Sequence, residues 1–173
     1  RYGEQFDNLG DYTRIVNARH HKRLCALLDS GKVFVGGQTD VNDRYIAPTV
    51  LTDVSPDSAA MQDEIFGPVL SIVRVKNLEE AITLENSHPY GNAAAIFTTS
   101  GAVAEHVIRR VEAGMVGVNI GVPVPREPFG FGGWNQSKFG HGNLTGLDGF
   151  RFWTRPRKVT VKWELQTDTT WMG

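Results

Sequence analysis

The sequence predicts an α/β protein built around a parallel sheet. Three apolar runs have the length and composition of strands, at residues 69–75, 93–98 and 115–120. Segments with helical spacing separate these runs, and strands that alternate with helices favour right-handed crossovers between parallel strands. A chain with 40% hydrophobic residues and 19 glycines is typical of a folded protein rich in strands and loops rather than of a disordered one.

The segment before residue 31 is expected to contain a loop and then a helix. Residues 3–10 are polar, as in a loop. A helix is expected over about residues 17–30, because Asn17 is a favourable N-cap and Gly31 a favourable end. One face of this helix carries the apolar residues of the segment: Ile15, Leu24, Leu27 and Leu28.

Two further strands are expected before the parallel series. The first covers residues 32–37 and ends in a turn at its two glycines. The second covers residues 45–51. Pro48 cannot donate a ladder hydrogen bond, so it indicates that this second strand is irregular or lies at an edge.

The two helices between the parallel strands have recognisable starts. Residues 78–84 have helical spacing, Asn77 is placed as an N-cap, and Glu80 follows at the capping-box position. Ser100 starts the next helix, which is expected to stop near Gly114. Its apolar stripe consists of Val103, Val107, Ile108 and Val111.

After residue 120 the chain changes character. Three prolines within residues 121–128 exclude a helix there, and residues 130–142 are rich in glycine and aromatic side chains. Residues 158–163 alternate, so that Val159, Val161 and Trp163 share one face of an expected strand. This late strand is expected to pair with another chain, and the alternative is a surface β-ribbon on its own domain.

Composition excludes several classes of partner and place. A net charge of −1 with 21% charged residues provides no basic field for nucleic acid or an anionic membrane. No apolar run approaches the roughly 20 residues that span a bilayer, and residues 1–6 lack the apolar core of a signal peptide. A single cysteine excludes an internal disulfide and fits a reducing compartment, so the cytoplasm or an organelle matrix is expected.

The most informative motif runs from Glu64 to Pro68, just before the first parallel strand. The Gly67-Pro68 turn would hold the Glu64 carboxylate and the Phe66 ring two residues apart at the mouth of that strand. A rigid carboxylate beside an aromatic ring suits a bound sugar with its attached heterocycle. The alternative is a capped turn with a packed phenylalanine.

Several motifs together make the chain resemble the C-terminal portion of an aldehyde dehydrogenase, from about Tyr12 to Trp163. From Pro89 onward the chain is most similar to methylmalonate-semialdehyde dehydrogenases, and before Pro89 it is closer to class 3 aldehyde dehydrogenases. The segments that carry the resemblance are Arg44-Tyr45-Ile46-Ala47-Pro48-Thr49-Val50, Glu64-Ile65-Phe66-Gly67-Pro68-Val69, Pro89-Tyr90-Gly91-Asn92, Gly114-Met115-Val116-Gly117-Val118-Asn119-Ile120 and Phe131-Gly132-Gly133 with Ser137.

The resemblance implies roles for three residues. Glu64 would accept hydrogen bonds from the nicotinamide ribose of NAD or NADP, and Phe66 would pack beside the nicotinamide ring. Phe131 would line the tunnel through which the aldehyde reaches the site, next to the Pro-rich loop 121–128. Coenzyme A is a further possible reactant, because the product would be the acid or its acyl-CoA ester.

The resemblance also implies how the chain is organised. Residues 1–149 would be the later part of the catalytic domain of the aldehyde dehydrogenase fold, which contains the parallel sheet. Residues 150–163 would be a C-terminal oligomerisation β-strand, and residues 164–173 a polar tail. The expected partners are a small-molecule aldehyde, the upstream half of the same enzyme and further copies in a homo-oligomer.

The chemistry of the family needs a cysteine nucleophile, and the match lies downstream of it. The only thiol is Cys25, on the apolar side of the first expected helix, where a packing role is favoured over a reactive one. The glycines at 130–133 lack the preceding strand of a Rossmann turn. We therefore expect a fragment without the nucleophile and the Rossmann domain, which would be inactive alone.

Other chemistries were weighed from the same residues. Adjacent His20 and His21 point about 100° apart on a helix, so no metal site is expected. The Ser137-Lys138 pair is too short a pattern to indicate a serine–lysine nucleophile. A non-catalytic assembly or binding module and a thiol enzyme that uses Cys25 stay open as alternatives.

Overall fold

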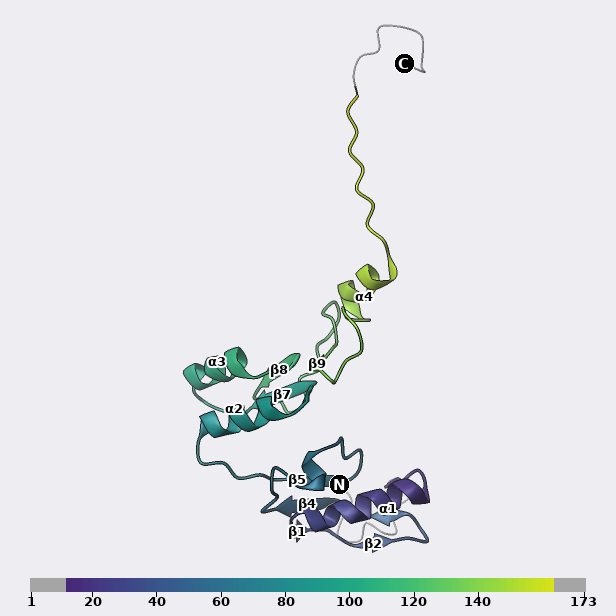
Figure 1. Ribbon diagram of the computed structural model, residues 1–173, viewed down its shortest axis with the longest axis vertical. Coiled ribbons are helices and arrows are strands. Elements are labelled where there is room, and N and C mark those ends of the chain that lie inside the picture. Colours follow the sequence, from purple (N-terminus) through teal and green to yellow (C-terminus); the bar gives the residue numbers. More distant parts are fainter. Residues whose placement is uncertain (1–11, 164–173) are drawn as a thin grey trace. The chain divides into compact units, whose positions relative to one another are not determined.

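A computed structural model describes residues 12–163 of the chain (Figure 1). The expected loop at residues 3–10 and the expected polar tail at 164–173 lie outside the described residues. The chain divides into two compact units between Pro89 and Tyr90. Within residues 12–163, no helix is both long and apolar enough to cross a membrane.

A mixed sheet of three strands forms the centre of the first unit. Strand β4 (Thr49–Thr52) lies between β1 (Lys32–Val35), which is antiparallel to it, and β5 (Val69–Ser71), which is parallel. Two shorter strands, β2 (Thr39–Asp40) and β3 (Tyr45–Ile46), form an antiparallel pair beside this sheet. The parallel pairing of β4 and β5 agrees with the predicted fold class.

Pro48 divides the expected strand at residues 45–51 into two strands. Ala47 donates its backbone N–H to Gln38 O at 2.9 Å, whereas Thr49 donates to Pro68 O at 2.8 Å. The chain changes partner at Pro48 because proline has no N–H for either ladder. The irregular position that the sequence predicted for Pro48 is confirmed.

The helix expected over about residues 17–30 is confirmed as α1 (Ala18–Leu27), and its last turn is a 3-10 helix, η1 (Leu28–Ser30). The Asn17 side chain caps its start by accepting from His20 N. Leu24 and Leu27 from α1 pack with Ile46 and Ala60, the latter from the 3-10 helix η2 (Ala59–Met61). This cluster joins the helix to the sheet.

The expected buried strand at residues 69–75 is shorter and less buried than predicted. Only Val69–Ser71 forms β5, and Leu70 is 60% exposed while Val69 belongs to the core. The prediction of a strand here is therefore confirmed, but the prediction that it is buried is wrong, because one face of β5 is exposed in this chain. Helix α2 (Leu78–Ser87) follows and begins at Asn77 as predicted, with Glu80 accepting from Lys76 N at 2.6 Å.

The second unit contains a parallel pair, β7 (Ala93–Ile96) and β8 (Met115–Val118), connected through helix α3 (Gly101–Arg110). Ser100 caps α3, but the helix ends at Arg110, earlier than the expected stop near Gly114. A small antiparallel pair joins β6 (Tyr90–Gly91) to β9 (Trp134–Asn135). Among the described strands, β5 pairs with β4 and β7 with β8, so the three predicted parallel strands are not recorded in one ladder.

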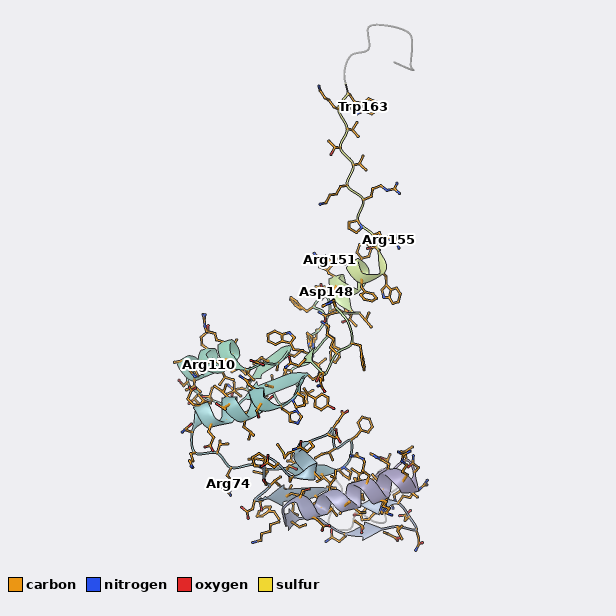
Figure 2. The ribbon with its side chains drawn as sticks, viewed as in Figure 1. Arg74, Arg110, Asp148, Arg151, Arg155 and Trp163 are labelled. Atoms are coloured by element: carbon orange, nitrogen blue, oxygen red, sulfur yellow. The ribbon has the colours of Figure 1, made fainter. Side chains whose placement is uncertain are left out.

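The C-terminal part contains a helix that was not predicted. Residues Gly146–Trp153 form α4, so residues 150–153 are helical rather than part of a strand. Figure 2 shows Asp148 and Arg151 on this helix. They form an ion pair, with 3.8 Å between Arg151 Nη1 and Asp148 Oδ1. Residues 154–163 follow α4 without assigned helix or strand and are exposed. The pairing of residues 158–163 with another chain stays a prediction.

Replacing Leu24 by alanine should lower the free energy of unfolding by about 2–5 kcal/mol, because Leu24 is fully buried and its loss leaves a cavity. Urea unfolding followed by far-ultraviolet circular dichroism measures this loss. Val16→Ala is the matched control, because Val16 is exposed just before the same helix. Equal unfolding midpoints for the two variants would contradict the assignment of Leu24 to the core.

Candidate functional site

The turn from Glu64 to Pro68 connects the core of the first unit to the start of β5. Ile65 points inward and packs against both core clusters, the one around Leu24 and the one around Leu51. Its two neighbours are exposed, and Phe66 has 76% of its surface accessible. The turn therefore presents a carboxylate and an aromatic ring to solvent on either side of a buried anchor.

Helix α1 holds the backbone of this turn through two side chains. His20 Nε2 lies 2.9 Å from Phe66 O, and Arg23 Nη2 donates to Ile65 O. Arg23 Nε also donates to His20 Nδ1 at 3.3 Å. Since a carbonyl oxygen only accepts, Nε2 of His20 carries the proton and Nδ1 is the acceptor.

The backbone of the turn is closely confined. Phe66 has φ of +49°, in the left-handed region that is unfavourable for a residue with a side chain. A Cβ added to Gly67 would lie 2.6 Å from both terminal methyl carbons of Leu24, so only glycine fits there. Contacts on both sides thus hold Phe66 in a conformation that it would not adopt alone.

Two grooves border the Phe66 ring. One, of about 380 Å³, lies between residues 12–16 and the turn, and the other, of about 630 Å³, lies along the first turn of α1. His20 and Phe66 line both grooves, while Arg19 and Arg23 add positive charge to the larger one. A ring flanked by open space can contact a flat ligand on its face.

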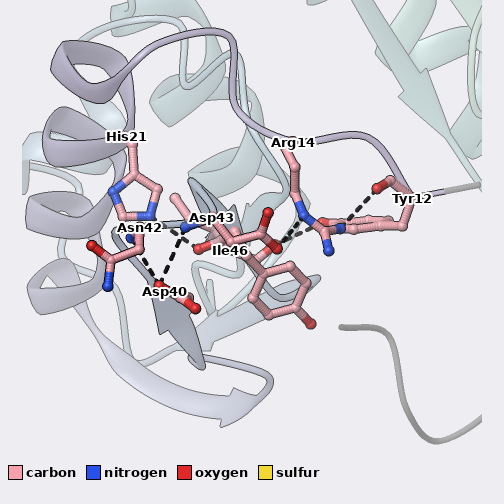
Figure 3. Close-up of polar contacts among 8 residues, drawn as sticks. Tyr12, Arg14, His21, Asp40, Asn42, Asp43 and Ile46 are labelled. Atoms are coloured by element: carbon pink, nitrogen blue, oxygen red, sulfur yellow. Dashed lines mark hydrogen bonds and ion pairs between the residues drawn. The ribbon is translucent and has the colours of Figure 1, made fainter. Parts of the chain in front are cut away.

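Polar contacts stabilise the wall of the smaller groove (Figure 3). Tyr12 donates its hydroxyl to Ile46 O at 2.8 Å. Arg14 donates to Asp43 Oδ2 at 2.6 Å, and its guanidinium lies 5.1 Å from the centre of the Tyr45 ring. These contacts attach the segment before α1 to the β2–β3 pair, so that segment has a defined place beside the turn.

Phe131 lies in the second unit, in the glycine-rich segment. Its backbone N–H donates to Thr145 Oγ1 at 2.8 Å, and its side chain is partly exposed. A Cβ on Gly132 would lie 2.1 Å from Asn143 Oδ1, so the glycine permits close packing, as the sequence indicated. Ser137 Oγ accepts from Gly91 N at 3.1 Å, which gives this hydroxyl a structural contact.

Cys25 packs against the core of the first unit. It is half-buried beside the cluster around Leu24, and its Sγ lies 3.6 Å from His21 Nδ1. His21 is buried, with Nε2 3.0 Å from Tyr45 O. The carbonyl requires a proton on Nε2, so Nδ1 accepts from the thiol. Within residues 12–163, three or more potential metal ligands nowhere gather into one group.

The structure places Glu64 and Phe66 on one turn and Phe131 in the other unit, each with exposed surface. The role of His20 and Arg23 in holding the Glu64–Pro68 turn was missed from the sequence, because His20 was considered only as a metal ligand and Arg23 was given no role. Their spacing of three residues puts them on one helical face. Nothing local indicates that the carbonyls of Ile65 and Phe66, more than 40 residues later, lie opposite that face.

A model of the aldehyde dehydrogenase family matches residues 1–159 of the chain. Malonate-semialdehyde dehydrogenase 2 of Bacillus thuringiensis is 39% identical over 161 residues, which cover 87% of this chain and 33% of the relative. The malonate-semialdehyde dehydrogenase of Listeria innocua is 37% identical over 159 residues, or 88% and 33% of the two chains. The chain thus spans about a third of the length of these curated relatives.

Solved structures agree with this match. A protein described as a methylmalonate-semialdehyde dehydrogenase of Sinorhizobium meliloti, solved with NAD, is 40% identical, with a TM-score of 0.81 over 89% of this chain and 33% of its own. The methylmalonate-semialdehyde dehydrogenase of Oceanimonas doudoroffii is 34% identical, with a TM-score of 0.81 over 87% and 33%. The resemblance drawn from the motifs and the predicted fold class are confirmed.

Replacing Gly67 by alanine should destabilise the chain by about 1–3 kcal/mol, because the new methyl group would overlap Leu24. Thermal unfolding measures the effect. Gly101→Ala is the matched control, because nothing lies within 4 Å of a Cβ at that position and alanine favours the helix. A Gly67→Ala variant as stable as Gly101→Ala would contradict the close packing of the turn on α1.

Proposed function

This chain belongs to the aldehyde dehydrogenase family, and we propose that it supplies the nicotinamide side of an NAD-dependent semialdehyde dehydrogenase site. The observation that carries the proposal is the rigid turn with Glu64 and Phe66 exposed on either side of buried Ile65. A purely structural turn has no need to present a carboxylate and a large ring to solvent.

Glu64 fits the role of ribose anchor. It is exposed, and no hydrogen bond from the described residues reaches its carboxylate. Both oxygens are therefore available to the two vicinal hydroxyls of a ribose, and such charge-assisted hydrogen bonds are about twice as strong as neutral ones. The backbone on which Glu64 stands is joined to α1 through Ile65, so binding would require little reorganisation.

Phe66 fits the role of a wall for the nicotinamide ring. Its side chain projects between two grooves, and the confined backbone limits the directions in which it can point. NAD, when bound, accepts a hydride from the substrate. The contribution of this chain would be to restrict the position of the ring that receives the hydride, because transfer depends steeply on geometry.

The nucleophile is proposed to come from protein other than these 173 residues. Cys25 is the only cysteine of the sequence, and it packs beside the Leu24 cluster and donates to His21. A thiol in such a setting has the features of a core residue. Taken alone, the chain would bind cofactor weakly and would not oxidise aldehydes.

Semialdehydes are the proposed substrates, because the relatives named above are malonate- and methylmalonate-semialdehyde dehydrogenases. Phe131 would line the aldehyde side of the site together with the Pro-rich loop. The product would be the acid or its acyl-CoA ester, so coenzyme A is a proposed second reactant, and NADP is the alternative cofactor.

A second candidate is a non-catalytic assembly or binding module on the same scaffold. The absence of a suitable cysteine from the 173 residues favours it, since fold alone does not establish activity. The two candidates differ in whether the Glu64–Phe66 turn binds a nicotinamide nucleotide. Calorimetric titration with NAD, with and without the upstream part of a relative added as a separate polypeptide, distinguishes them.

The arm at residues 154–163 is proposed to pair with a second copy of the chain. Val159, Val161 and Trp163 share one face by alternation and are all exposed, Trp163 to 92%. A strand with an uncovered apolar face gains stability by adding to the edge of a neighbouring sheet. Homo-oligomer formation would follow.

Glu64→Gln should weaken NAD binding by about 1–3 kcal/mol, because it removes a charge-assisted hydrogen bond to the ribose. The measurement is calorimetry on a chimera in which this chain replaces the matching third of the Bacillus thuringiensis relative. Asp63→Asn is the matched control, because it removes the same charge from the preceding exposed residue. Equal affinities for the two variants would remove Glu64 from the cofactor site.

Aspartates at Val159 and Val161 should shift the chain toward monomer, because charge on the packed face of a paired strand is costly to bury. Sedimentation velocity measures the distribution of species. Thr160→Asp puts an aspartate on the opposite face and should leave the oligomer intact, whereas either valine replaced alone, with the same single charge, should weaken it. An oligomer that survives the double substitution would rule out pairing through this face.

A further inference from the structure

The structure points to His20 and Arg23 as positioning residues for the cofactor, and we propose that they orient the Phe66 ring without touching the reacting atoms. This inference rests on the proposed function, in which Phe66 packs beside a nicotinamide ring. It adds a pair of side chains on α1 that set the orientation of the Phe66 ring.

The first argument is where the donors of α1 go. His20 and Arg23 lie three residues apart on one helical face and reach two consecutive carbonyls, those of Phe66 and Ile65. Carbonyls at an exposed turn can be solvated by water, so protein donors are not needed merely to satisfy them. Two directed donors instead fix the peptide planes on either side of the Phe66 side chain.

The second argument is the backbone of Phe66 itself. Its φ of +49° is unfavourable for phenylalanine and persists only when the surroundings impose it. Gly67 packs on Leu24 after it, and the two clamped carbonyls lie at and before it. We call His20 and Arg23, which hold these two carbonyls, the clamp. Without the clamp, φ of Phe66 would be free to return to negative values, and the side chain would then project from the backbone in a different direction.

The third argument is that little else holds the ring. Phe66 is 76% exposed, and within residues 12–163 its aromatic partner is the His20 ring, at 6.5 Å between centroids and 59° between planes. Its direction is therefore set by its backbone and by His20 rather than by core packing. His20 contacts both the carbonyl and the ring of the same residue.

Arg23 completes the clamp by selecting the tautomer of His20. Its Nε–H donates to Nδ1 of His20, which leaves the ring proton on Nε2, where it can be donated to Phe66 O. The relay runs from Arg23 through His20 to the turn, and Arg23 also reaches the turn directly at Ile65 O. Loss of Arg23 should therefore disturb Phe66 even though the two side chains need not touch.

Nuclear magnetic resonance on the full chain tests the clamp. In the wild type, His20 should carry its proton on Nε2. Phe66 should give a strong nuclear Overhauser effect between its own Hα and HN, because a positive φ brings these two protons close together. His20→Ala and Arg23→Ala should weaken that effect, whereas Lys22→Ala should not, because Lys22 is exposed on the same helix between the two clamp residues. An unchanged Phe66 signal in both clamp variants would overturn the proposal.

Titration with nicotinamide mononucleotide tests the consequence for the ligand, in the chimera in which this chain replaces the matching third of the Bacillus thuringiensis relative. The upfield ring-current shift of the nicotinamide protons at saturation should fall by about half or more in His20→Ala, while the dissociation constant changes by less than about twofold, because Glu64 still holds the ribose. His20→Gln should restore the shift, since its amide can donate to Phe66 O and accept from Arg23. Arg23→Lys should not retain the wild-type shift, because the lysine ammonium lacks the forked guanidinium that reaches both His20 Nδ1 and Ile65 O.

The outcomes separate this proposal from the one on which it rests. A chimera that carries the wild-type chain and gives no shift with the nucleotide, or a Glu64→Gln chimera that binds it equally well, overturns the proposed function, and with it the ligand part of this inference. A wild-type shift that persists in full in His20→Ala overturns the positioning role alone. A glutamine variant as impaired as the alanine variant would likewise overturn the hydrogen-bond mechanism.

Discussion

The packing of Gly67 on Leu24 is the contact on which the rest of the site depends. It brings the turn before β5 against helix α1, so that Ile65 enters the core and the residues on either side of it face outward. The same contact puts the carbonyls of the turn within reach of His20 and Arg23. A larger residue at position 67 would move the turn away from the helix, and the positions of the Glu64 carboxylate and the Phe66 ring relative to α1 would change.

The elements that could be predicted from the sequence are those specified locally. Asn17, Asn77 and Ser100 each cap a helix because a short polar side chain satisfies an N–H three residues later. Helix α4 could not be predicted in the same way, because it begins at Gly146 with φ of +60° and contains Gly149, which packs against Leu144 O. In a sequence such glycines indicate the end of a helix, and only the tertiary packing shows that they let other backbone segments come close to the helix.

The candidate site was predictable to a similar extent. Glu64 and Phe66 stand out because a turn motif joins them within three residues, and both are exposed as a ligand-binding role requires. Their support could not be foreseen, because it comes from a helix more than 40 residues earlier. The environment of Phe131 likewise depends on Asn143 and Thr145, which no motif connects to it. The roles proposed for all three residues follow from the family resemblance.

The junction between Pro89 and Tyr90 has a consequence for how such a chain can be engineered. It separates the β4–β5 ladder from the β7–β8 ladder, so no recorded strand pairing is cut there. A crossover at this junction would exchange whole hydrogen-bonded modules, and a hybrid gene joined at codon 89 would take the Glu64–Pro68 turn from one parent and the glycine-rich segment 130–142 from the other.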